Sequence, residues 1–105
     1  MNTFVAMLKT IKIDNDSEKF KQANSVHADY YKALIPEEKF LMSGPSLNEE
    51  GQFDGGIFII RAKDRTEAND IMSHDPLVES GYSDYDLVEF KPILVNPALK
   101  NILNK

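Results

Sequence analysis

Residues 55–60 read Gly-Gly-Ile-Phe-Ile-Ile, and this stretch decides the fold. Ile57–Ile60 lacks the polar alternation of a half-exposed strand. A continuous apolar run of this length is typical of a strand that is buried on both faces of a sheet. Gly55 and Gly56 precede the strand, whereas a phosphate-binding glycine loop joins a strand to a helix. We therefore interpret the two glycines as a close backbone approach or a bulge.

A second strand with two apolar faces is predicted at Thr3–Ile13. Successive residues of a strand point to opposite faces of the sheet. Here both sets are largely apolar, with Phe4, Ala6 and Leu8 on one face and Val5, Met7 and Ile11 on the other. Like the strand at 57–60, this one belongs in the centre of a sheet.

Two less apolar strands complete the predicted sheet. One spans Lys39–Ser43 and is closed by Gly44-Pro45, after which Ser46–Asp54 reads as a polar hairpin loop. The other spans Tyr85–Leu94, where Pro92 fits an edge or a strand end because proline cannot donate to a sheet ladder.

Two helices are predicted from apolar residues that recur in steps of three and four. The first spans about Ser17–Leu34, follows a turn in which Asn15 and Glu18 resemble a capping box, and stops at Pro36. Its inward stripe consists of Phe20, Ala23, His27, Tyr30, Tyr31 and Leu34.

The second helix starts at Asp64, where Glu67 completes an Asp-x-x-Glu cap, and runs to about His74. Pro76 ends it, because proline disfavours the helical conformation in the residue before it. Leu77–Asp84 is predicted to be a loop, and Pro97–Lys105 a short helical tail.

The predicted order is strand, helix, strand, strand, helix, strand. This order is that of the ferredoxin-like βαββαβ fold of the α+β class, an antiparallel sheet with two helices on one face. We expect one domain over residues 1–105, with its core in 3–95 and a tail in 96–105. Two helices cover only one face of the sheet, so we expect a homodimer to cover the other.

Composition narrows the classes of function. The net charge of −5 argues against nonspecific binding of nucleic acid or anionic membrane. The chain has no cysteine, only two histidines, and no HxxxH or HExxH spacing, so we expect no metal site and no cofactor. No transmembrane run or signal peptide is evident, and we expect a cytoplasmic location.

His27 and Asp75 are the candidate catalytic residues. Asp75 follows Ile71 by four residues and so shares the inward stripe of the second helix, where an apolar side chain is expected. A buried carboxylate needs a partner, and His27 is the imidazole on the facing stripe. Asp75 can alternatively bond only the backbone of an Asp-Pro turn, and His27 can be a structural histidine.

Other polar residues give weaker signals. Ser43 and Ser73 are available hydroxyls, but nothing in the sequence marks either as an activated nucleophile. His74 is a candidate second site residue, although a histidine at a helix end needs no such role. Tyr30 and Tyr31 fit either core packing or the wall of a pocket.

Taken together, the residues resemble the YciI-like (YCII-related) family of small dimeric α+β barrel proteins. The resemblance covers about residues 3 to 95 and rests on His27 with its aromatic followers, Ser43-Gly44-Pro45, Gly55-Gly56, Glu67-Ala68, Asp75-Pro76, Gly81 and Lys91-Pro92. Two positions depart from the family pattern. Glu38 stands where a glycine is usual, and Leu77 where an aromatic residue is common.

The resemblance implies a pocket at the sheet in which His27 and Asp75 form an acid–base pair. With them we place Tyr31, His74 and Ser43-Gly44-Pro45 as candidate substrate-binding residues. Dehydrochlorination of chlorinated hydroquinones is attributed to some members of the family.

The sequence leaves two classes of function open. One is a small cofactor-free enzyme, a lyase or isomerase acting on a small polar or aromatic molecule. The alternative is a non-catalytic ligand-binding or interaction module of the same fold. A pocket with His27 and Asp75 in hydrogen-bond reach favours the enzyme; a filled core with His27 bonded only to backbone favours the module.

Overall fold

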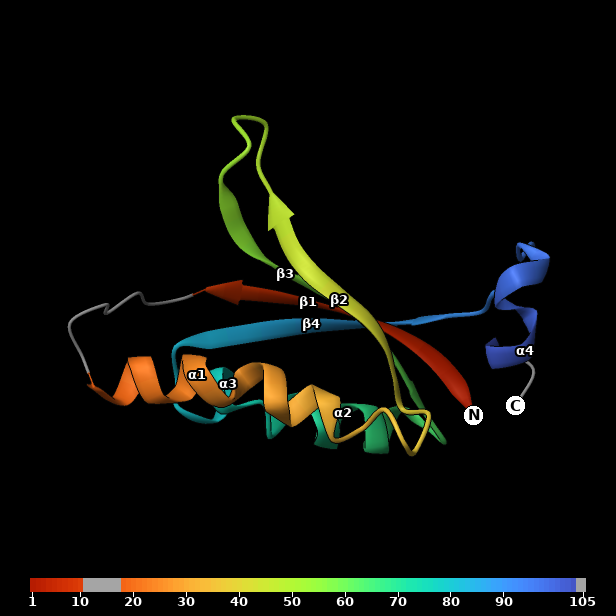
Figure 1. Cartoon of the computed structure of the whole chain (residues 1–105), viewed down its shortest axis with the longest axis horizontal. Coiled ribbons are helices and arrows are strands. Elements are labelled where there is room, and N and C mark those ends of the chain that lie inside the picture. Colours follow the sequence, from red (N-terminus) through yellow and green to blue (C-terminus); the bar gives the residue numbers. More distant parts are fainter. Residues whose placement is uncertain (11–17, 104–105) are drawn as a thin grey trace.

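The computed structural model describes residues 1–10 and 18–103. Four strands form one antiparallel sheet in the order β2-β3-β1-β4. Helices α1, α2 and α3 lie together on one face of this sheet (Figure 1). The predicted ferredoxin-like α+β fold is therefore confirmed. The strands are β1 (Asn2–Thr10), β2 (Phe40–Leu47), β3 (Phe53–Ala62) and β4 (Ser83–Phe90), and the helices are α1 (Glu18–Lys32), α2 (Arg65–Ser73) and α3 (Pro76–Glu79).

The core lies between the helices and the two central strands. Phe4 of β1 pairs with Ile60 of β3, and both side chains are fully buried. Burying an apolar side chain of this size stabilises a fold by roughly 1.5–3 kcal/mol. The alternation of β1 continues through Ala6 and Leu8 on the same side, as predicted from the sequence. The helices therefore pack on the two central strands.

The opposite face of the sheet is apolar and largely uncovered. Met7, Ile57 and Val88 are 40%, 43% and 50% exposed. Val5 lies between Ile59 and Val88 in the strand register, so one apolar row crosses three strands. We call this surface, made by Val5, Met7, Met42, Ile57, Ile59 and Val88, the outer sheet face.

Gly55 confirms the interpretation of the double glycine as a close backbone approach. Its φ is 155°, and a Cβ added there would collide with the carbonyl oxygen of Leu8. A Cβ added at Gly56 would lie 3.0 Å from the nearest carbon of the Phe58 ring, which is closer than ordinary van der Waals contact. These glycines let β3 pass close to β1 at the base of the hairpin that joins β2 to β3.

The prediction that Gly44-Pro45 closes the second strand was wrong. β2 continues through both residues to Leu47, with Pro45 paired opposite Gly56. β2 is an edge strand, where the missing N–H of proline leaves no ladder bond unmade. The polar loop is correspondingly shorter, a turn in which Gly51 donates to the carbonyl of Asn48. The β2–β3 hairpin rises away from the helical layer (Figure 1).

The prediction of a loop from Leu77 was also wrong at its start. Pro76 ends one helix and opens another, the single turn α3. Proline suits the first position of a helix, because the N–H that it lacks has no partner inside the helix. α3 packs against α1, and its Leu77 and Val78 contact the core. The residue that caps this short helix is Asp75.

The bounds predicted for the remaining strands and for the C-terminal tail agree in part with the structure. The first strand ends at Thr10 among the described residues, while positions 11–13 and the capping turn at 14–17 lie outside them. The last strand ends at Phe90, four residues before the predicted end. Beyond it, η1 (Pro97–Leu99) and α4 (Lys100–Leu103) form the expected helical tail. None of the helices in the described part of the chain is long and apolar enough to cross a membrane.

Candidate functional site

Asp75 lies between α2 and α3 and is completely buried, at 0% exposure. Its Oδ1 accepts a hydrogen bond of 2.8 Å from the backbone N–H of Leu77, which caps α3. This is the local turn bond that an Asp-Pro sequence favours. It occupies only one of the two carboxylate oxygens, so the other is available to α1.

The second oxygen of Asp75 receives two side chains from α1. His27 Nε2 lies 2.9 Å from Oδ2, and the hydroxyl of Tyr31 donates to the same oxygen at 2.5 Å. His27 and Tyr31 are four residues apart and therefore lie on the same face of α1, which packs against α3. The predicted approach of His27 and Asp75 within one hydrogen bond is confirmed.

These contacts explain how a carboxylate is tolerated at a fully buried position. An unpaired buried carboxylate costs several kcal/mol, whereas one whose oxygens all accept hydrogen bonds is accommodated. An ionised carboxylate has only acceptor sites, so the hydrogen bond to Oδ2 forms in the tautomer of His27 that carries its proton on Nε2. In that tautomer Nδ1, the other ring nitrogen, carries the free lone pair.

The two tyrosines of α1 have hydroxyls that stay protonated at neutral pH. Burial raises the pKa of Tyr31 far above its ordinary value, and the charge of Asp75 raises it further. Burial, with Asp75 as the next cause, raises the pKa of Tyr30 to about 12. Tyr30 donates to the carbonyl of Ile71 at 2.5 Å, one of the last carbonyls of α2. Both phenols thus tie α1 to the end of α2.

His27 is half-buried, with 23% of its side chain exposed. Its ring is roughly perpendicular to two aromatic rings, Tyr31 at 5.3 Å and Phe58 at 5.6 Å between centroids. The exposed part of His27 lines a pocket of about 350 Å³ between α1 and β2. The pocket walls are His27, Ala28, Tyr31 and Lys32 from α1, with Phe40, Met42 and Ser43 from β2. We call this space the His27 pocket.

An irregularity in β2 shapes the wall of the His27 pocket. The register of β2 against β3 shifts between Phe40 and Met42, which is the pattern of a β-bulge. A bulge bends an edge strand and redirects its side chains, and bulges are frequent next to active sites. Here it brings residues on both sides of the shift to the same pocket.

The structure brings together only some of the residues predicted to bind substrate. Tyr31 and Ser43 line the His27 pocket, whereas Gly44 and Pro45 do not. His74 also lies outside it. Its Nδ1 is 2.7 Å from the backbone carbonyl of Asp70, and that contact, with the Asp70 carboxylate, raises the His74 pKa. His74 caps the C-terminus of α2, the role that a histidine at a helix end can fill without substrate.

Sequence reasoning missed two features of the pocket. It placed Tyr31 in the core or in a pocket wall and did not foresee the bond to Asp75. The available signal was the spacing of four residues from His27, which puts both donors on one helix face. It also overlooked Lys32, because a basic residue in the last turn of a helix is explained by the helix dipole alone.

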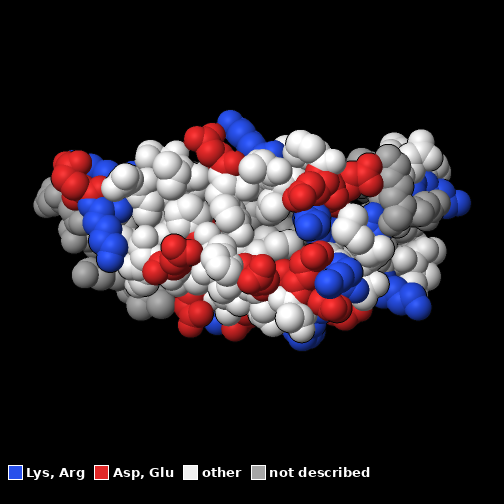
Figure 2. All heavy atoms as spheres, turned by 90° about the horizontal axis from the view of Figure 1, so that it is seen from below, with Lys and Arg blue, Asp and Glu red and all other residues white. Residues whose placement is uncertain are grey.

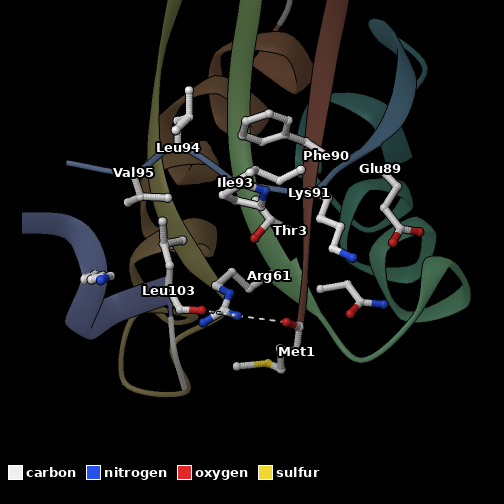
Figure 3. A pocket seen from close by; sticks show the side chains of 13 residues that line it. Met1, Thr3, Arg61, Glu89, Phe90, Lys91, Ile93, Leu94, Val95 and Leu103 are labelled. Atoms are coloured by element: carbon white, nitrogen blue, oxygen red, sulfur yellow. Dashed lines mark hydrogen bonds between the residues drawn. The ribbon is translucent and has the colours of Figure 1, made fainter. Parts of the chain in front are cut away.

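A second pocket, of about 580 Å³, lies between the N-terminus, the end of β4 and the C-terminal tail. Figure 3 shows Arg61 at its base, where Nη2 donates to the carbonyls of Met1 at 2.8 Å and Leu103 at 3.2 Å. These bonds hold both ends of the described chain against β3. This pocket shares no lining residue with the His27 pocket. Although it is larger, its lining contains no imidazole and carboxylate that could act as a proton-transfer pair.

The surface of the helical face carries charges of both signs (Figure 2). On the helical face, Lys and Arg side chains of the described residues lie among acidic ones rather than in one basic patch (Figure 2). Within the described ranges, no three of the His, Asp and Glu side chains gather in a geometry that could hold a metal ion.

The model of one protein family, described as the YCII-related domain, matches residues 3–91. No curated protein sequence matches the chain.

Solved structures with the same fold include two enzymes. One is 5-chloro-2-hydroxyhydroquinone dehydrochlorinase from Burkholderia phenoliruptrix AC1100 in complex with 2,5-dihydroxybenzoquinone, at 18% identity and a TM-score of 0.64, covering 85% of this chain and 93% of that one. Another is muconolactone isomerase, at 14% identity and a TM-score of 0.69, covering 90% and 94%. A dimeric ferredoxin-like protein from an uncultured marine organism is similar at 17% identity and a TM-score of 0.51, covering 90% and 96%. At these identities the likeness shows the fold alone.

Proposed function

The chain belongs to the YCII-related domain family, and we propose that it is a small enzyme that uses His27 as a general acid–base. The reaction class is that of a lyase or isomerase, acting on a small polar or aromatic molecule without a cofactor. Asp75 orients the imidazole, and Tyr31 holds Asp75. The observation that carries this proposal is the partly exposed His27 ring, bonded to a fully buried carboxylate at the wall of a pocket.

His27 suits proton transfer because its two ring nitrogens have separate tasks. Nε2 is engaged by Asp75, so Nδ1 is the nitrogen left to exchange a proton with substrate. An imidazole can accept a proton and then return it, so it can act as base and acid in turn. When Nδ1 takes a proton, the adjacent carboxylate of Asp75 balances the new charge. Tyr31 stays neutral and keeps donating throughout, since its pKa is raised.

This proton chemistry serves both reaction classes. A lyase base removes a proton from carbon while a leaving group departs from the neighbouring atom with the bonding electron pair. An isomerase base removes a proton and returns it to another atom of the same molecule. Two of the similar structures are named as a dehydrochlorinase and a lactone isomerase, which supports this pair of classes.

We propose further that the protein is a homodimer joined through the outer sheet face. Met7, Ile57 and Val88 leave between 40% and 50% of their surface exposed there, on a sheet whose other face is covered. An apolar surface of this kind marks an interaction site in soluble proteins. The name of one similar structure, a dimeric ferredoxin-like protein, supports a second copy as the partner.

Turnover of a small panel of substrates tests the proposed activity. The panel contains chlorinated hydroquinones, followed by release of chloride, and unsaturated lactones, followed by ultraviolet absorbance. General acid–base catalysis contributes roughly 100- to 10,000-fold, so His27→Ala is expected to lose at least about 100-fold in kcat/KM. Asp75→Asn is expected to lose activity as well, because an amide can donate to Nε2 and favours the wrong tautomer.

The second histidine provides the matched control. His74 is exposed and lies outside the His27 pocket, so His74→Ala is expected to keep the wild-type turnover. If His27 had only a structural role, the variant would give a different result. His27→Ala would then lower thermal stability while leaving any measured turnover intact, and that outcome contradicts the proposal.

A further inference from the structure

The His27 pocket contains a positive charge that proton transfer does not use. Lys32 lines it, one turn beyond Ala28 on α1. Lys32 forms no ion pair with any residue that the structure describes, and no Asp or Glu lines the pocket beside it. Lys32 is exposed, so its ammonium group can turn toward a ligand in the pocket.

A hydroxyl faces the same space from the other wall. Ser43 of β2 lines the pocket, and its side chain makes no hydrogen bond with any residue that the structure describes, so its hydroxyl can donate to a ligand. Two donors of different kinds, an ammonium and a hydroxyl, match the two oxygens of one carboxylate. Besides the His27 and Tyr31 rings, the rest of the lining is apolar, from Ala28, Phe40 and Met42, and suits a flat hydrocarbon body.

The spacing along α1 separates this charge from the imidazole. His27 and Lys32 are five residues apart, so their Cα atoms are separated by about 7.5 Å along the helix axis. Both side chains line the same pocket, so a molecule that places a carboxylate at Lys32 can reach His27 with its reacting atoms. The long lysine side chain can adjust to the length of the ligand.

We infer that the substrate of the His27 pocket carries a carboxylate on a small flat body, and that Lys32 with Ser43 binds this carboxylate. The inference rests on the proposed function, because it names the substrate class of the same site. Lys32 is a specificity-determining residue in this arrangement, while His27 remains the residue that moves the proton.

Binding of benzoate tests the inference without any turnover. Amide proton–nitrogen spectra of the full chain are titrated with benzoate and with benzamide, which has the same ring but no charge. Benzoate is expected to shift the amide signals of Ala28, Lys32 and Ser43 and to bind at least roughly tenfold more tightly than benzamide. The preference is expected to weaken with added salt, since the pocket is open to solvent.

Variants assign the effect to one side chain. Lys32→Met is expected to remove the preference for benzoate, and Lys32→Arg to retain it. Lys19→Met is the matched control, because Lys19 is an exposed lysine of α1 outside the pocket.

Four outcomes overturn the inference. They are equal binding of benzoate and benzamide, absence of binding, unchanged benzoate affinity in Lys32→Met, and shifts centred on Lys91 and Lys100 in the pocket at the C-terminal tail. Failure of the proposed function looks different, because benzoate then binds in a Lys32-dependent manner while no panel substrate turns over. Turnover that depends on His27, with no Lys32-dependent binding, leaves the function and removes this substrate class.

Discussion

Tyr31 and His27 bond to a single oxygen, Oδ2 of Asp75, from successive turns of α1. The hydroxyl of Tyr31 is the shorter contact at 2.5 Å, against 2.9 Å for the imidazole. Because the two donors share one acceptor, the position of the imidazole depends on a carboxylate that Tyr31 helps to fix. Tyr31 is therefore a positioning residue in this account, and its removal should affect both stability and proton transfer.

Tyr31→Phe removes the hydroxyl and keeps the ring that packs between Phe40 and Phe58. A hydrogen bond to a charged group contributes about 1.5–3 kcal/mol, so we expect unfolding in urea to show a loss in that range. Tyr30→Phe is the control, because its hydroxyl bonds a neutral carbonyl and should cost less, about 0.5–1.5 kcal/mol. An equal cost for the two variants would contradict the assigned role of the Tyr31 hydroxyl.

The same tyrosines predict a loss of stability at alkaline pH. In the unfolded chain they ionise near pH 10, whereas in the folded chain burial keeps the pKa of both above that value, about 12 for Tyr30. The stabilisation is complete below pH 10 and declines above it, because the unfolded state releases protons that the folded state retains. The free energy of unfolding, measured between pH 9 and 12, should fall less steeply in Tyr31→Phe than in wild type. Parallel curves would argue against the raised pKa.

Glu38 has the backbone conformation that its place in the turn demands of a glycine. Its φ is 59°, a left-handed value that costs a residue with a side chain about 1–2 kcal/mol. Glycine avoids that cost but adds about 0.5–1 kcal/mol of backbone entropy to be lost on folding. We expect Glu38→Gly to stabilise the protein by about 0.5–1 kcal/mol in thermal or urea unfolding. Glu37→Gly, next to it and without a positive φ, should give no gain; a similar gain there would refute the explanation.

The proposed dimer predicts a mass of about twice 11.9 kDa in sedimentation at micromolar concentration. Val88→Lys places a charge on the outer sheet face and should produce monomers, because a buried unpaired charge disfavours association. Val26→Lys, at an exposed valine of α1 on the helical layer, should remain dimeric. A monomeric wild type would contradict the proposal.

The sequence predicted those parts of the fold that depend on local patterns. The alternation from Phe4 to Leu8 and the run at Ile57–Ile60 identified the central strands, because side-chain burial in a sheet follows directly from residue period. Proline was a less reliable signal. Pro45 was taken as a strand end and Pro76 as a helix end, whereas an edge strand tolerates the first and a new helix begins at the second.

Two residues of the candidate site, His27 and Asp75, could be predicted from the sequence, but the full group of interacting side chains could not. The need of a buried Asp75 for a partner pointed to His27 without knowledge of the distance between their helices. The spacing of four residues places Tyr31 beside His27 on one helix face, but its bond to Asp75 was identified only from the packing of α3 against α1. His74 is adjacent to Asp75 in sequence yet bonds Asp70 at the surface, because consecutive helix-end residues point to different sides.

We predict that Asp75 holds His27 with its proton on Nε2, so that Nδ1 is the nitrogen offered to substrate. Nitrogen-15 chemical shifts of the His27 ring measure this directly, at a pH where the imidazole is neutral. Wild type should show a protonated Nε2 and a bare Nδ1, and Asp75→Asn should lose that preference. A ring that carries its proton on Nδ1 in wild type, or that is unaffected by Asp75→Asn, would contradict the account.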